Sequence, residues 1–328
     1  MATQRQQKLI VLLLALLCIV LPIHARSASN TPHLADPFAD PKHDPYNPLK
    51  YIASNTLTAI AFTLVMVVAL TQSYWTYRFG AKWMLSMVIG EYTFALGIGT
   101  RFGLHYHPDS EPIYIIEYLF VVLSPCAFIA ANYVLLGRMA RHTGCSKHLL
   151  IPANRITKIF VASDVTTFLI QAAGGGLLVS TNPSTALTGS HIFLAGLVLQ
   201  LVSFFSFSCL FCFYIYRVYT SEPEVWTRDT KGVAKKPWFR DWRTLAGALG
   251  LSCIGILIRS VYRVAELSQG FQGYLATTEA FFYGLDTLPL FIAISVYVPF
   301  WPAFFIPPVQ RTEVEVSKEA ERDSTEGV

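Results

Sequence analysis

The chain has 328 residues, of which 53% are hydrophobic and 14% are charged, and its formal net charge is +4. This composition excludes a pair of soluble domains and indicates one polytopic membrane domain. The net charge is small and its distribution matters more than its size, and no nucleic-acid partner is expected.

Both ends of the chain differ from its apolar middle. Residues 1–25 are predicted to form a signal peptide, because the apolar stretch Leu9–Leu21 follows two basic residues and is too short to cross a membrane. Retention of this segment as an anchor is the alternative. Residues 26–48 are rich in Pro, Asp and Asn and are predicted to form an extracellular tail. Residues 307–328 are acidic and poor in apolar side chains, which predicts a disordered cytosolic tail.

Seven apolar stretches of about 20 residues lie between these ends, each long enough for a helix that crosses a bilayer. No stretch alternates with the period of two that a membrane barrel requires. The predicted fold class is therefore all-α, a seven-transmembrane-helix bundle over residues 49–306. The spans are expected near 52–72, 82–103, 113–137, 156–179, 190–216, 244–265 and 279–301.

The loops predict the orientation of the bundle. Segments 74–82, 138–158 and 217–243 carry most of the loop Lys and Arg residues, whereas 104–112 and 180–190 carry almost none. Basic loops stay on the cytosolic side, so the N-terminus is expected outside and the C-terminus in the cytosol.

The 217–243 loop interleaves basic and large aromatic residues. One interpretation is that the aromatic residues anchor the next helix at the membrane interface. The alternative is contact with anionic lipid headgroups. The aromatic residues are Trp226, Trp238, Phe239 and Trp242.

Several spans carry charges that should lie inside the bilayer. Such a charge costs at least about 2.5 kcal/mol and usually faces a bundle interior, where it marks a site or pathway. Arg259, Arg263 and Glu266 are spaced i, i+4 and i+7, which places them on one helix face. Glu279 and Asp286 share a face of the last span. Because unpaired arginines in a membrane are too costly, Arg259 or Arg263 is expected within ion-pair reach of Glu279, Asp286, Glu266 or Glu91.

Other spans repeat this arrangement. Asp164 and Gln171 lie two turns apart, and Glu91 lies about three turns before Arg101. We predict that Asp164, Gln171, Arg259, Arg263, Glu266, Glu279 and Asp286 bind substrate, and that Glu91, Arg101, Glu117 and Gln200 support them. In this hypothesis the site opens outward and Asp164 is a gating carboxylate near the cytosolic end. The alternative is that the outer charges are interfacial ion pairs that only hold the helices together.

Prolines and glycines also interrupt the spans. Pro125 and Pro289 are predicted to kink their helices. The glycines at 174–176 indicate either close helix approach or an unwound turn. No Lys-Ser/Thr pair follows them, so they do not predict a phosphate loop. No cofactor or metal is expected, and the hydrolase alternative lacks a visible set of partners.

Four runs are similar to the fungal lipid-translocating exporter family, also called RTA-like. The resemblance covers nearly all seven spans. The runs are Ile113–Arg138, Ile159–Leu177, Gly189–Phe207 and Ile258–Pro289, and the pattern includes Pro125, Asp164, Gln171, the glycine triplet, Arg259, Arg263, Glu266, Gly270, Gly273, Glu279 and Asp286.

The resemblance implies a non-enzymatic, multi-pass protein of the plasma membrane, with an endomembrane or the vacuole as alternatives. It also implies translocation of sphingoid long-chain bases and resistance to toxic amphiphiles. The chain departs from the family in its second span, where Phe94 occupies a usual glutamate position and Glu91 is the substitute. In the third span Glu117 occupies the place of a usual glutamine.

Two function classes remain at this point. The first is a transporter, or a factor that controls lipid distribution between the leaflets. The second is a seven-helix receptor that senses lipids or membrane asymmetry. The seven predicted spans fit both, but the absence of a predicted pair of outer cysteines and the charged stripe on span 244–265 favour transport.

Overall fold

The computed structural model describes residues 38–44, 47–178, 182–226, 241–270 and 273–306. The predicted signal peptide and acidic tail lie outside these ranges, as do most of the predicted outer tail and the side chains of Trp238 and Phe239.

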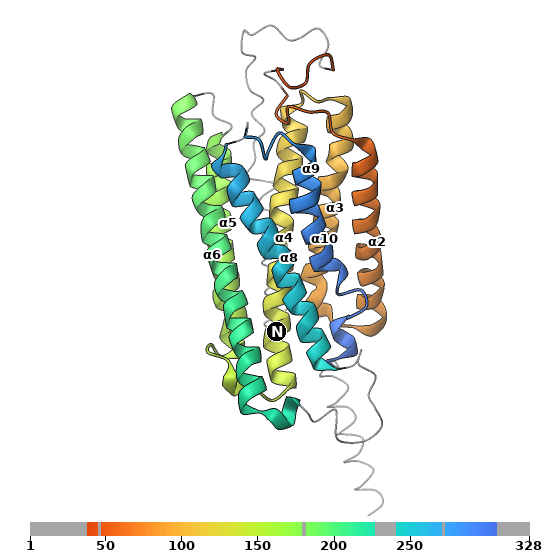
Figure 1. The fold of residues 1–328 in the computed structure, drawn as a ribbon, viewed down its shortest axis with the longest axis vertical. Coiled ribbons are helices and arrows are strands. Elements are labelled where there is room, and N and C mark those ends of the chain that lie inside the picture. Colours follow the sequence, from red (N-terminus) through yellow and green to blue (C-terminus); the bar gives the residue numbers. More distant parts are fainter. Residues whose placement is uncertain (1–37, 45–46, 179–181, 227–240, 271–272, 307–328) are drawn as a thin grey trace, which may run out of the picture.

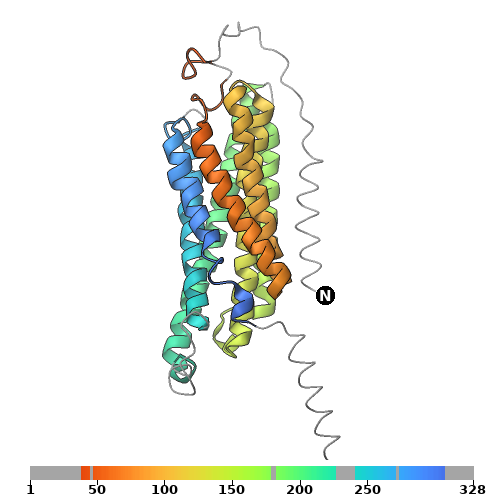
Figure 2. The same ribbon diagram turned by 90° about the vertical axis from the view of Figure 1, so that its right-hand side faces the viewer.

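The described residues form one elongated bundle of helices that run along its long axis (Figures 1 and 2). No β-strand occurs in these ranges, as the sequence predicted. The long helices are α2 (Asn55–Phe79), α3 (Leu85–Tyr106), α4 (Glu111–His142), α5 (Ala153–Leu178), α6 (Pro183–Ser221) and α8 (Trp242–Ser268). A last helix has three pieces: α9 (Glu279–Phe281), the π-helical η4 (Phe282–Thr287) and α10 (Leu288–Ser295). Short 3₁₀ turns occur at η1 (Lys82–Met84), η2 (Ser146–His148) and η5 (Pro302–Phe304).

Each predicted span coincides with one of these helices. Within the described ranges, five helices are long and apolar enough to cross a membrane, namely α2, α4, α5, α6 and α8. Helix α3 is not among the five because Glu91 and Arg101 lower its hydropathy. The last helix is not among them because it is divided into short pieces. The chain is a multi-pass membrane protein, while the count of seven spans and their orientation stay predictions.

The distribution of side chains is that of a membrane protein. Leu57, Ile60, Leu64 and Val67 form an outward stripe on α2 and are between 42% and 56% exposed. Polar side chains are instead found inside, where Gln72 is fully buried and donates a hydrogen bond to the Ile294 carbonyl. The apolar surface faces the lipid and the polar groups face the bundle interior.

Helix α4 is the most enclosed of the five, because 78% of its apolar window is buried, against 33–50% for the others. It contacts α3, α5 and α8. Pro125 lies inside α4 without ending it, so the helix continues from the end that carries Glu117 to the end that carries Arg138 and Arg141.

The glycines of α5 allow close helix approach. A Cβ on Gly174 would lie 2.5 Å from the backbone nitrogen of Phe193 on α6, and one on Gly189 would lie 2.8 Å from the Gly174 carbonyl oxygen. All three glycines at 174–176 are helical. The structure therefore supports close approach, and the alternative of an unwound turn is wrong.

The last helix is less regular than predicted. Pro289 has no N–H for the carbonyl of Leu285, and the turn before it widens so that the Leu288 N–H bonds to the Tyr283 carbonyl. The helix ends at Ser295, short of the predicted residue 301. The widened turn carries Asp286, which is fully buried.

Candidate functional site

Arg263 and Asp286 form the most completely satisfied charged pair in the described ranges. Arg263 Nε donates to Asp286 Oδ1 at 2.7 Å and Nη2 donates to Oδ2 at 2.9 Å. Arg263 Nη1 also donates to Glu266 Oε2 at 2.9 Å. Because a planar guanidinium matches a carboxylate in this bidentate geometry, the pair fixes α8 against η4.

Arg259, one turn away on α8, joins the same carboxylate. Its Nε lies 3.0 Å from Asp286 Oδ1, and its Nη2 donates to the Val121 carbonyl of α4 at 2.6 Å. Pro125 has no N–H to bond that carbonyl, four residues before it, so the Val121 carbonyl accepts the Ser124 hydroxyl and the arginine in place of a helical N–H. We call Arg259, Arg263, Glu266 and Asp286 the Arg263 cluster.

A second cluster surrounds Arg101 of α3. Arg101 Nη1 donates to Glu117 Oε1 at 2.6 Å, and Nη2 donates to the Tyr51 hydroxyl at 2.9 Å. The same Nη2 is 3.4 Å from Glu279 Oε1, which also accepts the Ser54 N–H at 2.8 Å. We call Arg101, Glu117, Glu279 and Tyr51 the Arg101 cluster.

Phe282 lies between the clusters. Its ring centroid is 4.1 Å from the Cζ atom of Arg101 and 5.7 Å from that of Arg263. The Tyr283 ring lies 5.4 Å from the Arg101 Cζ and the Tyr118 ring 5.6 Å from the Arg263 Cζ. Aromatic faces therefore supplement the carboxylates as partners for cations here.

The two clusters together contain three arginines and four carboxylates, so they hold one more carboxylate than arginine. The carboxylates differ in access. The Asp286 side chain is fully buried and the Glu117 side chain is 4% exposed, whereas those of Glu266 and Glu279 are 13% and 19% exposed. Glu266 and Glu279 are thus the acidic groups that a ligand can approach.

Tyr51 precedes the first long helix and closes the Arg101 cluster. Burial raises the pKa of its hydroxyl to about 12, although the nearby Arg101 charge acts in the opposite direction. The hydroxyl therefore stays neutral at physiological pH and accepts the arginine N–H. The His105 ring binds the Ala53 carbonyl at 2.7 Å, which holds this segment against α3.

The predicted polar residues of α5 and α6 form a separate group. Gln171 donates to Gln200 at 2.8 Å, and Gln200 donates to Cys126 Sγ at 3.1 Å, which links α5, α6 and α4. Asp164 accepts only a long bond of 3.4 Å from Ser203, and its Oδ2 has no hydrogen-bond partner. Within the described ranges these hydrogen bonds link α4, α5 and α6 and do not reach either arginine cluster.

All seven charged members of the two clusters were predicted from the sequence as site residues. The predicted convergence of Arg259 and Arg263 with Glu266 and Asp286 is confirmed. Arg101 pairs with Glu117 and Glu279 and not with Glu91, which has no ion-pair partner among the described residues. Tyr51, Ser54 and the Val121 carbonyl were missed.

The opposite end of the bundle carries the basic loops. Trp226 packs edge-on against Trp242, and Arg243 donates to the Trp226 carbonyl at 3.1 Å and is paired with Asp241. These contacts hold Trp226 against the start of α8.

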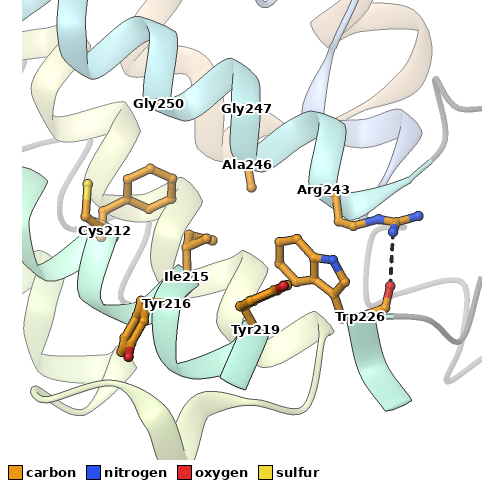
Figure 3. Close-up of a pocket in the computed structure, with 10 residues that line it drawn as sticks. Cys212, Ile215, Tyr216, Tyr219, Trp226, Arg243, Ala246, Gly247 and Gly250 are labelled. Carbon is orange, nitrogen blue, oxygen red and sulfur yellow. Dashed lines mark hydrogen bonds between the residues drawn. The ribbon is translucent and has the colours of Figure 1, made fainter. Parts of the chain in front are cut away.

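An apolar groove of about 550 Å³ lies beside them, between α6 and α8 (Figure 3). Arg243 is its one charged lining residue. Its lining also includes Phe211, Cys212, Ile215, Tyr216, Tyr219, Trp226, Ala246, Gly247 and Gly250.

Comparison with known proteins identifies the family. The family described as "RTA1 like protein" matches residues 87–308. Protein RTA1 of Saccharomyces cerevisiae is 30% identical over 213 residues, which are 65% of this chain and 63% of the relative. Protoporphyrin uptake protein 1 of the same yeast is 33% identical over 196 residues, 58% and 59% of the two chains. The sphingoid long-chain base transporter RSB1 is 26% identical over 271 residues, 75% and 69% of the two chains.

The match spans less than two thirds of the length of RTA1 and of the protoporphyrin uptake protein. No solved structure matches the chain. The family match covers both arginine clusters apart from Tyr51. The chain belongs to the RTA1-like family.

Proposed function

We propose that this member of the RTA1-like family translocates cationic amphiphiles of the sphingoid long-chain-base class. The observation that carries the proposal is the pair of arginine–carboxylate clusters with one carboxylate in excess. Two of these carboxylates, Glu266 and Glu279, are partly exposed. A buried acidic excess matches an ammonium headgroup, and the surrounding apolar side chains match an alkyl chain.

Glu279 is the best receptor for the headgroup. Its contact with Arg101, at 3.4 Å, is the weakest of the ion pairs in the two clusters. An ammonium can replace that contact while Arg101 keeps Glu117 and Tyr51. The rings of Phe282 and Tyr283, which now face Arg101, provide further cation-binding surface.

Asp286 has a different role in this proposal. Because both of its oxygens are bound by Arg263 and one also contacts Arg259, it holds the two arginines and does not receive the headgroup. This refines the sequence hypothesis, in which Glu266, Glu279 and Asp286 were equivalent. Asp164, Gln171 and Gln200 are proposed to line the path further along the bundle, with Asp164 as the gate.

The names of two relatives support transport of this kind. One is called a sphingoid long-chain base transporter and another a protoporphyrin uptake protein.

We further propose seven membrane spans, with the N-terminus outside, the C-terminus in the cytosol and the plasma membrane as the location. The clusters would then open on the outer side. Contact of the 217–243 loop with anionic lipids is retained as part of the proposal.

Release of a labelled long-chain base from cells with and without the protein tests this function. We expect faster release and higher resistance to the base when the protein is present. Unchanged release, together with signalling that depends on added lipid, would support the receptor alternative instead.

A further inference from the structure

Glu91 differs from the four carboxylates of the clusters. It lies in the middle of α3 with no exposed surface. Neither of its carboxylate oxygens has a hydrogen-bond partner. Glu117, Glu266, Glu279 and Asp286 each have an arginine within ion-pair distance.

The following charged side chains on α2 and α4, the helices that pack most closely against α3, make contacts with groups other than Glu91. On α4, Glu117 binds Arg101, Arg138 lies 4.8 Å from the Trp83 ring, and Arg141 donates to the Gly137 carbonyl. On α2, the charged residue is Arg78, which lies 5.7 Å from the Phe79 ring at the far end of the helix. The described ion pairs therefore leave Glu91 without a countercharge.

An isolated ionised carboxylate in an apolar interior costs far more than a neutral one, and in practice such a group takes up a proton. We propose that Glu91 is a proton-binding site, and that its proton is exchanged during each transport cycle. In the binding step a proton from the solvent forms an O–H bond with one carboxylate oxygen of Glu91, which leaves the side chain neutral. A metal cation is not the ligand of choice, because a lone carboxylate lacks the several oxygen ligands that such ions require.

The position of Glu91 connects this proton to the substrate site. Glu91, Phe94, Ile98 and Arg101 lie on one face of α3, at spacings of three, seven and ten residues, and all are buried. Ten residues of helix correspond to about 15 Å. Because α3 is a continuous helix that carries both residues, we infer that loss of the Arg101–Glu279 contact on substrate binding is transmitted along α3 to Glu91. This coupling rests on the proposed transport function, whereas the protonation of Glu91 does not.

Infrared spectroscopy of the purified protein at neutral pH tests the proton site directly. We expect the carbonyl stretch of a protonated carboxyl in the wild-type protein to lose intensity in Glu91→Gln, which imitates the neutral acid. The matched variant Glu117→Gln removes an arginine-bound carboxylate and should leave that band unchanged. If Glu91→Gln does not fold, Glu91→Asp retains a protonatable group and should shift the band. An unchanged band in the folded Glu91 variant overturns the proposal.

Transport into proteoliposomes with an imposed pH gradient tests the coupling. Reversing the gradient should change the wild-type rate severalfold, while Glu91→Gln should transport at the same rate in both directions of the gradient. The same gradient dependence in both proteins overturns the coupling. A protein that transports no long-chain base contradicts the proposed function and the coupling, and the infrared result still decides whether Glu91 binds a proton.

Discussion

Arg259 Nη2 donates a 2.6 Å hydrogen bond to the Val121 carbonyl oxygen across the α4–α8 interface. The acceptor lacks its usual backbone partner because Pro125 has no N–H to bond it within α4, where only the Ser124 hydroxyl donates to it. The proline therefore does more than alter the path of the helix, since it supplies a backbone partner for a buried arginine. Hydrogen bonds to charged groups contribute about 1.5–3 kcal/mol to the free energy of unfolding. The contact therefore contributes substantially to the packing of α8 against α4.

Pro125→Ala should restore the helical N–H and compete with Arg259 for the Val121 carbonyl. Arg259→Met should then cost less in this background than in the wild-type protein, by about 1 kcal/mol or more. Thermal unfolding of the two single variants and the double variant measures the coupling. Additive effects, within about 0.5 kcal/mol, would show that the two residues act independently.

Asp286→Asn should destabilise the protein strongly, because two buried arginines lose their shared countercharge. Breaking one partner of a buried ion pair typically costs about 3–5 kcal/mol. Glu266→Gln is the matched control, since it removes one contact from Arg263 and leaves Asp286 in place. Unfolding in detergent should rank the loss at position 286 well above that at 266. Equal losses would contradict the anchoring role of Asp286.

The glycine triplet offers a matched pair of substitutions. Gly174→Ala should separate α5 from α6, because the new Cβ would meet the Phe193 backbone at 2.5 Å, and overpacking of this kind costs about 1–3 kcal/mol. At Gly176 nothing lies within 4 Å of the added Cβ, so Gly176→Ala should be neutral or slightly stabilising. The yield and melting temperature of the two variants distinguish them, and identical behaviour would argue against tight packing at Gly174.

The sequence predicted the helices well because membrane helices are read from apolar length alone. It also predicted that Arg259 or Arg263 would meet one of the carboxylates, of which Asp286 is the one that both contact, since buried arginines need countercharges and helical spacing sets which residues share a face. It did not predict the division of the last helix, which depends on how the chain accommodates Pro289 next to its neighbours.

The partners of the cluster residues that lie outside the helical periodicity of the sequence were harder to predict. The sequence contains a signal for the Val121 contact, because a proline at 125 frees the carbonyl at 121, but the position of Arg259 opposite it depends on the packing of α4 against α8. Tyr51 and Ser54 come before the first span, where no periodicity marks a residue as buried. Glu91 was assigned a supporting role from its position on the helix, and only its lack of partners reveals how different it is.

Asp164→Asn should reduce amphiphile resistance without lowering the amount of protein at its membrane. The substitution keeps the side-chain volume, and the present carboxylate has only one long hydrogen bond, to Ser203, so little stability should be lost. Resistance assays and quantitative immunoblots of membrane fractions measure the two effects. A parallel fall in resistance and protein amount would show that Asp164 supports the structure and is not a gate.

The most direct test of headgroup recognition compares a sphingoid base with its N-acetylated form of the same chain length in cells that express Glu279→Gln. Removing the carboxylate charge should lower protection against the cationic base about tenfold, which corresponds to about 1.4 kcal/mol, and should leave protection against the uncharged form intact. Glu222→Gln, which alters a carboxylate paired with Lys147 at the opposite end of the bundle, should retain protection against both. Equal loss for the two compounds in a well-expressed Glu279→Gln protein would contradict the recognition of the ammonium group by Glu279.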